Sequence, residues 1–367
     1  MRQKRFLLIL VLAAVCVPNV IMREISLLPS APPALLPLSK EVARISSSHM
    51  DYAWPSNDSF LKFEFYPHPG MTQKDLRTGA EVSLTSLQRR TGESVIYPIA
   101  ISPDGKKALW EDRRDTGPRF HSTSLEGSPP LSHTLLSNRF WTSASNPVWM
   151  PDNKRWIQLF AAERGISAVV CEDGKAKAVQ EINIGKPKGT SSGYDLMRTH
   201  LLGVTHTGRV LGTPEGADGY PNAQHSRHID FFEFSLDSTH PNVREYTIAL
   251  PKGEKGYENN VALTGDEKVE LSPQGDQLAW LVHRRIEFPV QRWVSRWLPG
   301  KITTSRLFTE LRITNLDGTS GRTIGTIEPQ KSSRSIFDER PFGMHWLPDG
   351  QHISFIFNGS LWVVPTH

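Results

Sequence analysis

The chain has little cysteine and little net charge. Its 367 residues include two cysteines, Cys16 and Cys171, which is too few for a disulfide framework or for a structural zinc site built from cysteine clusters. Three charges of the formal net +4 lie within the first five residues, so the rest of the chain carries about +1. A nucleic-acid partner is therefore not expected. Cys171 follows an apolar stretch and is expected at a buried strand position.

Several motifs that carry chemistry are also missing. The chain has no Gly-x-Ser-x-Gly nucleophile elbow, no Gly-x-Gly-x-x-Gly segment and no phosphate-binding loop. The segment Gly189–Gly193 is rich in Gly and Ser but lacks the lysine and the strand-to-helix context of such a loop. No histidine or cysteine cluster has metal-ligand spacing. We therefore expect no cofactor and no metal, and we assign no catalytic residue.

No apolar run is long enough for a typical membrane span. The longest, Phe6–Val17, has twelve residues and follows a basic N-terminus, whereas a spanning helix needs about twenty. Residues 1–22 are therefore expected to be a signal peptide or, counted through Met22, a membrane anchor. Residues 23–40 form a Pro-rich spacer, and residues 41–367 form the folded domain. This order predicts an exported protein that is periplasmic, or membrane-anchored and facing outside the cytoplasm.

The chain does contain a short repeated turn. Proline presets the φ angle of the second position of a β-turn, Asp or Asn suits the third, and Gly or Asn accepts the positive φ that follows. Such a turn between apolar strands closes a tight hairpin. Four good copies are Ser102–Gly105, Met150–Asn153, Ser272–Gly275 and Leu347–Gly350, and two degenerate copies are Trp54–Asp58 and Thr205–Gly208.

A second turn follows the first at a steady distance. Gly127 lies 22 residues after Gly105, and Gly174 lies 21 residues after Asn153. Each unit therefore contains two hairpin turns and four strands. Repeats of about 40 to 50 residues with four strands are typical of propeller blades. The sequence predicts an all-β fold, a six-bladed β-propeller of four-stranded antiparallel blades behind the N-terminal segment.

The combined pattern resembles the TolB-type, WD-like β-propeller repeat. Blades of that family carry Trp-Ser-Pro-Asp-Gly, an apolar strand and a Leu-Asp-Gly turn. Trp149 and Trp346 stand at equivalent positions before the turn and are expected in the core. The resemblance implies an extracytoplasmic propeller in the cell envelope. Only two strands follow Gly350, so we expect Glu41–Ser46 to supply the missing outer strand and close the ring.

Four expansions interrupt the regular spacing of the repeat. Two lie within copies, at 212–228 and 284–305, and two link copies, at 252–266 and 321–341. In a propeller, the loops between second and third strands emerge on the same face as the links between blades. Function often lies on loops that a rigid scaffold carries. We therefore expect this face to bind a protein or another envelope ligand, and we expect the chain to be a monomer.

One expansion combines tryptophan with arginine. Val290, Trp293, Val294 and Trp297 recur at helical spacing. One interpretation is a contact with a partner or a membrane surface through residues 286–299. The alternative is a short helix that folds back and buries its tryptophans on the propeller. The candidate binding residues in this segment are Arg292, Trp293, Arg296 and Trp297.

A second candidate group is Tyr220, His225 and His228. Some propeller lyases that act on uronates use histidines and a divalent metal on this kind of face. Here two histidines lie close in sequence, and no carboxylate stands at diagnostic spacing. Solvated loop histidines are the preferred interpretation. The predicted function is a non-catalytic binding or scaffold module, and the alternative is a propeller enzyme, a lyase or hydrolase acting on a polysaccharide or another exported substrate.

Overall fold

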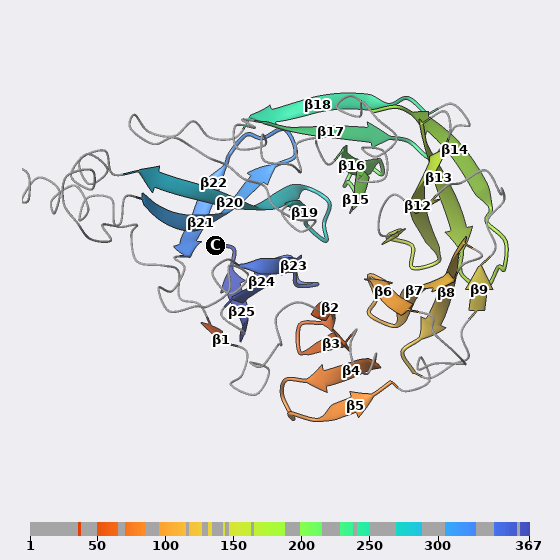
Figure 1. Cartoon of the computed structure of the whole chain (residues 1–367), viewed down its shortest axis with the longest axis horizontal. Coiled ribbons are helices and arrows are strands. Elements are labelled where there is room, and N and C mark those ends of the chain that lie inside the picture. The colour runs from red at the N-terminus through yellow and green to blue at the C-terminus, as the bar shows by residue number, and fades with distance from the viewer. Residues whose placement is uncertain are drawn as a thin grey trace, which may run out of the picture.

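The structure is a computed structural model that describes the chain in sixteen segments. Within them the chain forms 25 strands, and six sheets surround a common centre (Figure 1). The described part contains no helix that is long and apolar enough to cross a membrane. The described residues are 36–37, 50–64, 70–84, 95–114, 117–126, 131–133, 142–143, 147–162, 165–187, 199–214, 228–237, 241–249, 269–287, 305–327, 341–357 and 360–367.

Each sheet is an antiparallel blade. Blade 1 contains β2 (Met50–Ser56), β3 (Ser59–Glu64), β4 (Gly70–Asp75) and β5 (Glu81–Ser83). Blade 2 contains β6 (Val95–Ile101), β7 (Lys107–Arg114), β8 (Gly117–Ser124) and β9 (Leu131–His133). Blade 3 contains β10 (Thr142–Ser143) and β11 (Val148–Trp149), which both pair with β12 (Arg155–Ala162), followed by β13 (Gly165–Glu172) and β14 (Gln180–Gly185).

The other three blades follow the same plan. Blade 4 contains β15 (Thr199–Val204), β16 (Val210–Pro214), β17 (His228–Phe234) and β18 (Arg244–Ala249). Blade 5 contains β19 (Val269–Leu271), β20 (Gln277–Glu287), β21 (Ser305–Asn315) and β22 (Arg322–Ile327). Blade 6 contains β23 (Phe342–Trp346), β24 (His352–Phe357), β25 (Ser360–Pro365) and, on its outer side, β1 (Leu36–Pro37).

The predicted six-bladed propeller is confirmed by contacts that run around the ring. The innermost strands β2, β6, β11, β15, β19 and β23 each contact the next, and β23 returns to β2. Each of the six seams between neighbouring blades holds its own apolar cluster of described residues. Trp149 and Trp346 are 5% and 6% exposed, as expected for core residues. The core is therefore divided among the seams rather than collected in one place.

The N-terminal side of the chain closes the ring on the outside. Leu36 pairs with Val363 and Pro37 with Trp362, so an early segment does supply the fourth strand of blade 6. These pairing residues precede Glu41–Ser46, the expected closing strand, which lies outside the described residues. The repeat indicated that an outer strand was missing, but it did not specify which residues on the N-terminal side would pair. An outermost strand also tolerates a proline, because one of its edges needs no ladder hydrogen bond.

Both kinds of predicted turn are present, and they share one face of the ring. The Gly105 amide donates to the Ser102 carbonyl at 2.8 Å, and the degenerate fourth copy repeats this bond from Gly208 to Thr205 at 2.8 Å. These turns join the first and second strands of a blade. The second turns, such as the one at Asp173, join the third and fourth strands. Since antiparallel strands reverse at each turn, both kinds lie at the same blade end, which we call the turn face.

The predicted expansions leave from the other blade end, which we call the insertion face. β16 ends at Pro214 and β17 begins at His228, while β20 ends at Glu287 and β21 begins at Ser305. The segments between them lie outside the described residues. Three of the predicted expansions have different bounds in the structure. Residues 212–214 still belong to β16, and Arg322–Ile327 of the predicted link at 321–341 form β22. In blade 5, Arg284–Glu287 continue β20 and pair with β21 rather than belonging to a loop. The expansion therefore extends a hairpin before it leaves the sheet.

Candidate functional site

Direct hydrogen bonds connect neighbouring turns on the turn face. The Asp104 amide of blade 2 donates to Asn153 Oδ1 of blade 3 at 2.9 Å. The Asp349 amide of blade 6 donates to Asn57 Oδ1 of blade 1 at 3.1 Å. Asn153 and Asn57 occupy the same turn position in their own blades. Where asparagine stands there, its side chain caps the turn of the preceding blade. We call this set of connected turns the turn ring.

Glycine occupies that turn position in four blades, and in three of them the turn packs closely against the neighbouring blade. A β-carbon on Gly105 would collide with the Pro55 carbonyl of blade 1, and one on Gly350 would collide with the Gln274 side chain of blade 5. Gly105 also has a φ of +70°, a conformation that glycine accepts most readily. The repeated turn therefore has two roles: it closes a hairpin, and it provides the surface against which the neighbouring blade packs.

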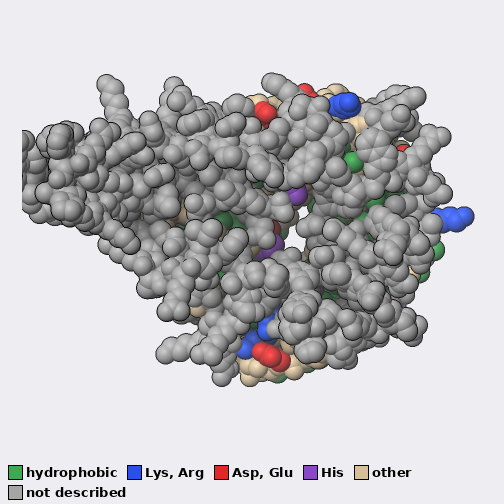
Figure 2. Space-filling view, in the orientation of Figure 1, with side chains coloured by type: hydrophobic (Ala, Val, Ile, Leu, Met, Phe, Trp, Pro, Cys, Tyr) green, Lys and Arg blue, Asp and Glu red, His purple; other side chains and the backbone are tan. Residues whose placement is uncertain are grey.

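A polar cluster on the innermost strands joins blades 5 and 6. The Glu270 carboxylate of β19 accepts the Trp346 amide at 2.6 Å and lies 2.8 Å from His345 Nδ1, both on β23. The Trp346 indole also donates to the Glu270 carbonyl at 3.2 Å. The Glu270 and His345 side chains are 29% and 28% exposed. Figure 2 shows histidine side chains at the central opening of the propeller.

The same cluster continues into blade 1. The Tyr52 hydroxyl of β2 donates to the Gly343 carbonyl of β23, and the Tyr52 ring meets the His345 ring edge to face at 4.8 Å. Ser354 is fully buried in β24, and its hydroxyl accepts the Trp54 indole N–H at 2.8 Å. We call Tyr52, Trp54, Glu270, His345 and Ser354 the central clasp.

A carboxylate beside His345 resembles part of a general-base arrangement, in which the acid orients the imidazole. In this structure the same carboxylate also binds a backbone amide, and the imidazole packs on Tyr52. The observed contacts therefore connect three blades around the channel. Their direct physical effect is to fix the positions of the innermost strands of blades 5, 6 and 1.

The central clasp was missed at the sequence level, although the repeat contains a signal for it. Tyr52, Glu270 and His345 stand at one repeat position, two residues before the first turn residue. The corresponding residues of blades 2, 3 and 4 are Ala100, Val148 and Gly203. Aligning the copies by their turns would have singled out this position. It would not have shown that the three side chains belong to one connected cluster.

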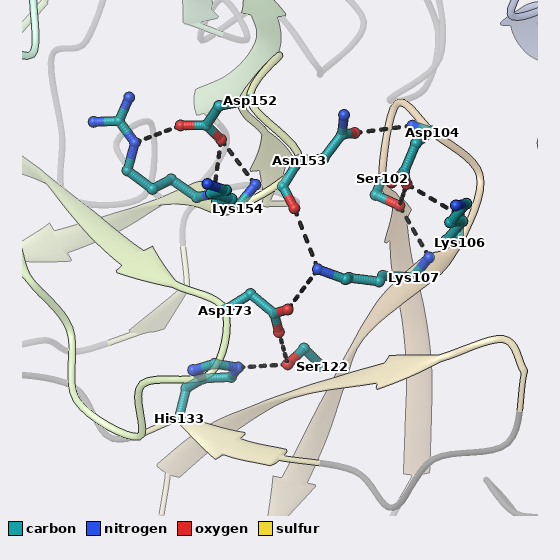
Figure 3. A network of polar contacts seen from close by, with 11 residues as sticks. Ser102, Asp104, Lys106, Lys107, Ser122, His133, Asp152, Asn153, Lys154 and Asp173 are labelled. Atoms are coloured by element: carbon teal, nitrogen blue, oxygen red, sulfur yellow. Dashed lines mark hydrogen bonds and ion pairs between the residues drawn. The ribbon is translucent and has the colours of Figure 1, made fainter.

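A second polar network connects blades 2 and 3 on the turn face (Figure 3). Lys107 Nζ lies 2.6 Å from Asp173 Oδ2, and Ser122 Oγ donates to Asp173 Oδ1 at 2.9 Å. Burial alone would raise the pKa of Asp173, but these two hydrogen bonds and the Lys107 charge hold it below the ordinary value of 3.8. Asp173 is therefore a carboxylate at neutral pH, shared between a cation and a hydroxyl.

The structure leaves most of the predicted site residues unplaced. His228 begins β17 at the insertion face, where its backbone pairs with Ala249, and its side chain is not described. The convergence of His225 and His228 with carboxylates, which would favour an enzyme, is therefore not tested. Among the described residues, no group of three or more His, Cys, Asp or Glu could hold a metal ion. The predicted binding residues that lie outside the described segments are Tyr220, His225, Arg292, Trp293, Arg296 and Trp297.

Cys171 occupies the buried strand position expected for it. It lies in β13 with no exposed surface, and burial raises the pKa of its thiol to about 12. Because the thiolate is the nucleophile, iodoacetamide at pH 8 should leave Cys171 unmodified in the folded protein and modify it after unfolding in urea. Peptide mass spectrometry would distinguish it from Cys16. Modification of Cys171 in the folded protein would contradict its placement.

Comparisons with known proteins give likenesses to solved structures only. No protein-family model and no curated protein matches the sequence. Hydrazine synthase from Kuenenia stuttgartiensis is 14% identical, with a TM-score of 0.45, and the match covers 84% of this chain and 73% of that one. TolB from Acinetobacter baumannii is 11% identical, with a TM-score of 0.43 and coverages of 87% and 63%.

Oligogalacturonate lyase from Vibrio parahaemolyticus is a third match. It is 9% identical, with a TM-score of 0.47, and the match covers 92% of this chain and 96% of the lyase. The matches thus include a TolB protein, from the family whose repeat the sequence resembles, and also two enzymes. Likenesses this remote do not bear on what this chain binds or catalyses.

Proposed function

We propose that the chain is an exported, non-catalytic binding propeller whose insertion face holds a protein or another envelope ligand. The observation that carries this proposal is the shape of blade 5. β20 and β21 have eleven residues each and stay paired from Gln277 opposite Asn315 to Glu287 opposite Ser305. Their inner neighbour β19 has three residues. Blade 5 therefore extends a two-stranded hairpin toward the insertion face.

Further features support the same face. The long segments between β16 and β17, and between β20 and β21, both leave from it, as do the long links that precede β19 and β23. The hairpin leads directly into the segment with Arg292, Trp293, Arg296 and Trp297. Residues 286–299 are proposed to contact the ligand or a membrane surface. The turn ring and the central clasp would keep the propeller that carries this face rigid, which lowers the entropic cost of binding.

The test is photo-crosslinking in intact envelopes of cells that make the protein. A photoreactive amino acid is placed at Glu287 or at Ser305, the last and first strand residues of the hairpin. The matched control position is Lys154, which is exposed on the turn face. We expect adducts from the two hairpin positions and none from Lys154. Adducts from Lys154 alone would contradict the proposal.

A second variant separates loss of binding from loss of fold. Residues 288–304 are replaced by a Gly-Ser linker in the full chain, and the photoreactive residue is kept at Glu287. We expect the adducts to disappear while the midpoint of thermal unfolding changes by only a few degrees, because the strands of blade 5 remain paired. Unchanged adducts would show that the proposed contact segment is not needed.

A further inference from the structure

A buried histidine on the turn face connects blades 2 and 3. His133 ends β9 and is 4% exposed. Its Nδ1 lies 2.9 Å from the Lys175 carbonyl of blade 3, and its Nε2 lies 2.9 Å from Ser122 Oγ of β8. Ser122 in turn lies between His133 and Asp173, which is paired with Lys107 (Figure 3). The four side chains form one continuous path.

Counting protons along this path shows two distinct states. A carbonyl oxygen only accepts hydrogen bonds, so the contact with Lys175 places a hydrogen on His133 Nδ1. In the neutral imidazole, Nε2 is then an acceptor. Ser122 has one hydroxyl hydrogen, and both His133 Nε2 and the Asp173 carboxylate need it. One of the two 2.9 Å contacts therefore lacks a hydrogen while His133 is neutral.

Protonation of His133 removes this shortage. The imidazolium donates from Nε2 to Ser122, and Ser122 donates to Asp173, so every contact on the path has a hydrogen. The cost is a buried charge beside Asp173, which already holds the Lys107 ammonium at 2.6 Å. The protonated state thus has complete hydrogen bonding but brings two cations to one carboxylate.

We propose that Ser122 is a hydrogen-bond relay that couples protonation of His133 to the Asp173–Lys107 ion pair and makes the seam between blades 2 and 3 sensitive to pH. Lys107 Nζ also donates to the Asn153 carbonyl at 3.4 Å, and Asn153 Oδ1 caps Asp104. The relay is therefore connected to the turn ring. This is a regulatory device of the scaffold, and it does not depend on the proposed ligand.

Several groups surround His133. Burial lowers its pKa below 6.5, while the Lys175 carbonyl and the Asp173 charge raise it, and burial dominates. The Lys175 ammonium is paired with Glu172 at 2.7 Å, and the Trp156 ring meets the imidazole edge to face at 5.3 Å. The folded state therefore binds fewer protons than the unfolded state just below pH 6.5. The contribution of His133 to the free energy of unfolding is therefore full above pH 6.5, and it is lost as the pH drops through 6.5 toward the folded-state pKa of His133.

The test is an NMR titration of the His133 imidazole nitrogens in the full chain. The wild-type protein should show the Nδ1–H tautomer at neutral pH and a midpoint below 6.5. Ser122→Ala changes no charge but removes one hydrogen bond from the neutral state and two from the protonated state. It should lower the midpoint further, by about half a unit to one unit.

Ser132→Ala is the matched control, because Ser132 lies next to His133 on β9 and contacts His121 Nδ1 at 2.9 Å. It should leave the midpoint of His133 unchanged. An unchanged or raised midpoint in Ser122→Ala would overturn the relay. Should that variant not fold, the wild-type tautomer decides, since an Nε2–H tautomer of the neutral ring would remove the competition for the Ser122 hydrogen.

Discussion

Gly105→Ala should destabilise the propeller by about 2–5 kcal/mol. Two costs add at this position. A φ of +70° costs an L-residue about 1–2 kcal/mol, and forcing a methyl group into a packed site costs about 1–3 kcal/mol more. The added methyl group would meet the backbone carbonyl of Pro55, which cannot rotate away as a flexible side chain could. The free energy of unfolding in urea measures the effect.

Gly208→Ala is the matched control for Gly105→Ala. Gly208 has the same turn position in blade 4 and a φ of +77°, but nothing lies within 4 Å of an added β-carbon. The Gly208→Ala variant should lose only about 1–2 kcal/mol of its free energy of unfolding, which is the cost of the backbone conformation. The difference between the two variants isolates the contact between neighbouring turns. Equal losses would mean that the turn ring contributes nothing beyond the conformation of each turn.

The blade count was predictable because its signal is local. Proline, Asp and Gly impose their turn conformations within four residues, so four copies such as Ser102–Gly105 were enough to establish the repeat. The degenerate copy Thr205–Gly208 still makes the same turn with a threonine and a histidine in place of Ser-Pro. Spacing between turns then indicated four strands per blade. These features need no knowledge of which blades are neighbours.

Contacts across seams were not predictable in the same way. The hydrogen bond from the Asp349 amide to Asn57 Oδ1 joins residues almost at opposite ends of the domain, and it forms only because the ring closes. The central clasp likewise joins Tyr52 to Ser354 of blade 6, residues that are 302 positions apart in the sequence. A repeat pattern specifies each blade separately, whereas these contacts depend on ring curvature and closure.

The candidate binding residues could be selected from the sequence, but their conformation could not be predicted from it. His228 and the segment around Trp293 were selected because they depart from the repeat, so the repeat gives no information about their conformation. The structure fixes the strand ends that carry them, at His228 and Glu287, and thereby the face on which they emerge. Their chemistry depends on side chains outside the described residues.

Ser354→Ala should be the second large effect, with a loss of about 2–4 kcal/mol. The Ser354 hydroxyl accepts the Trp54 indole N–H at 2.8 Å and donates to the His345 carbonyl at 3.1 Å. Removing it leaves the buried Trp54 N–H and the part-buried His345 carbonyl without this partner, and a buried group left unsatisfied costs about 1–3 kcal/mol. Urea unfolding again provides the measurement. Ser59→Ala is the control, because Ser59 is also buried but bonds to Ser56 within its own hairpin.

The size of the Ser354→Ala effect would show where the ring is held closed. Blade 6 meets blade 1 at the turn ring through Asn57 and at the central clasp through Ser354, while on its outer side it pairs with β1 through two residues. The described outer pairing is short, whereas Ser354 in the clasp is fully buried and joins several polar groups. We therefore expect Ser354→Ala to cost clearly more than Leu36→Gly, which weakens only the outer strand. A larger loss from Leu36→Gly would place the main closure at the outer edge of blade 6, and the clasp would then serve chiefly to position the innermost strands.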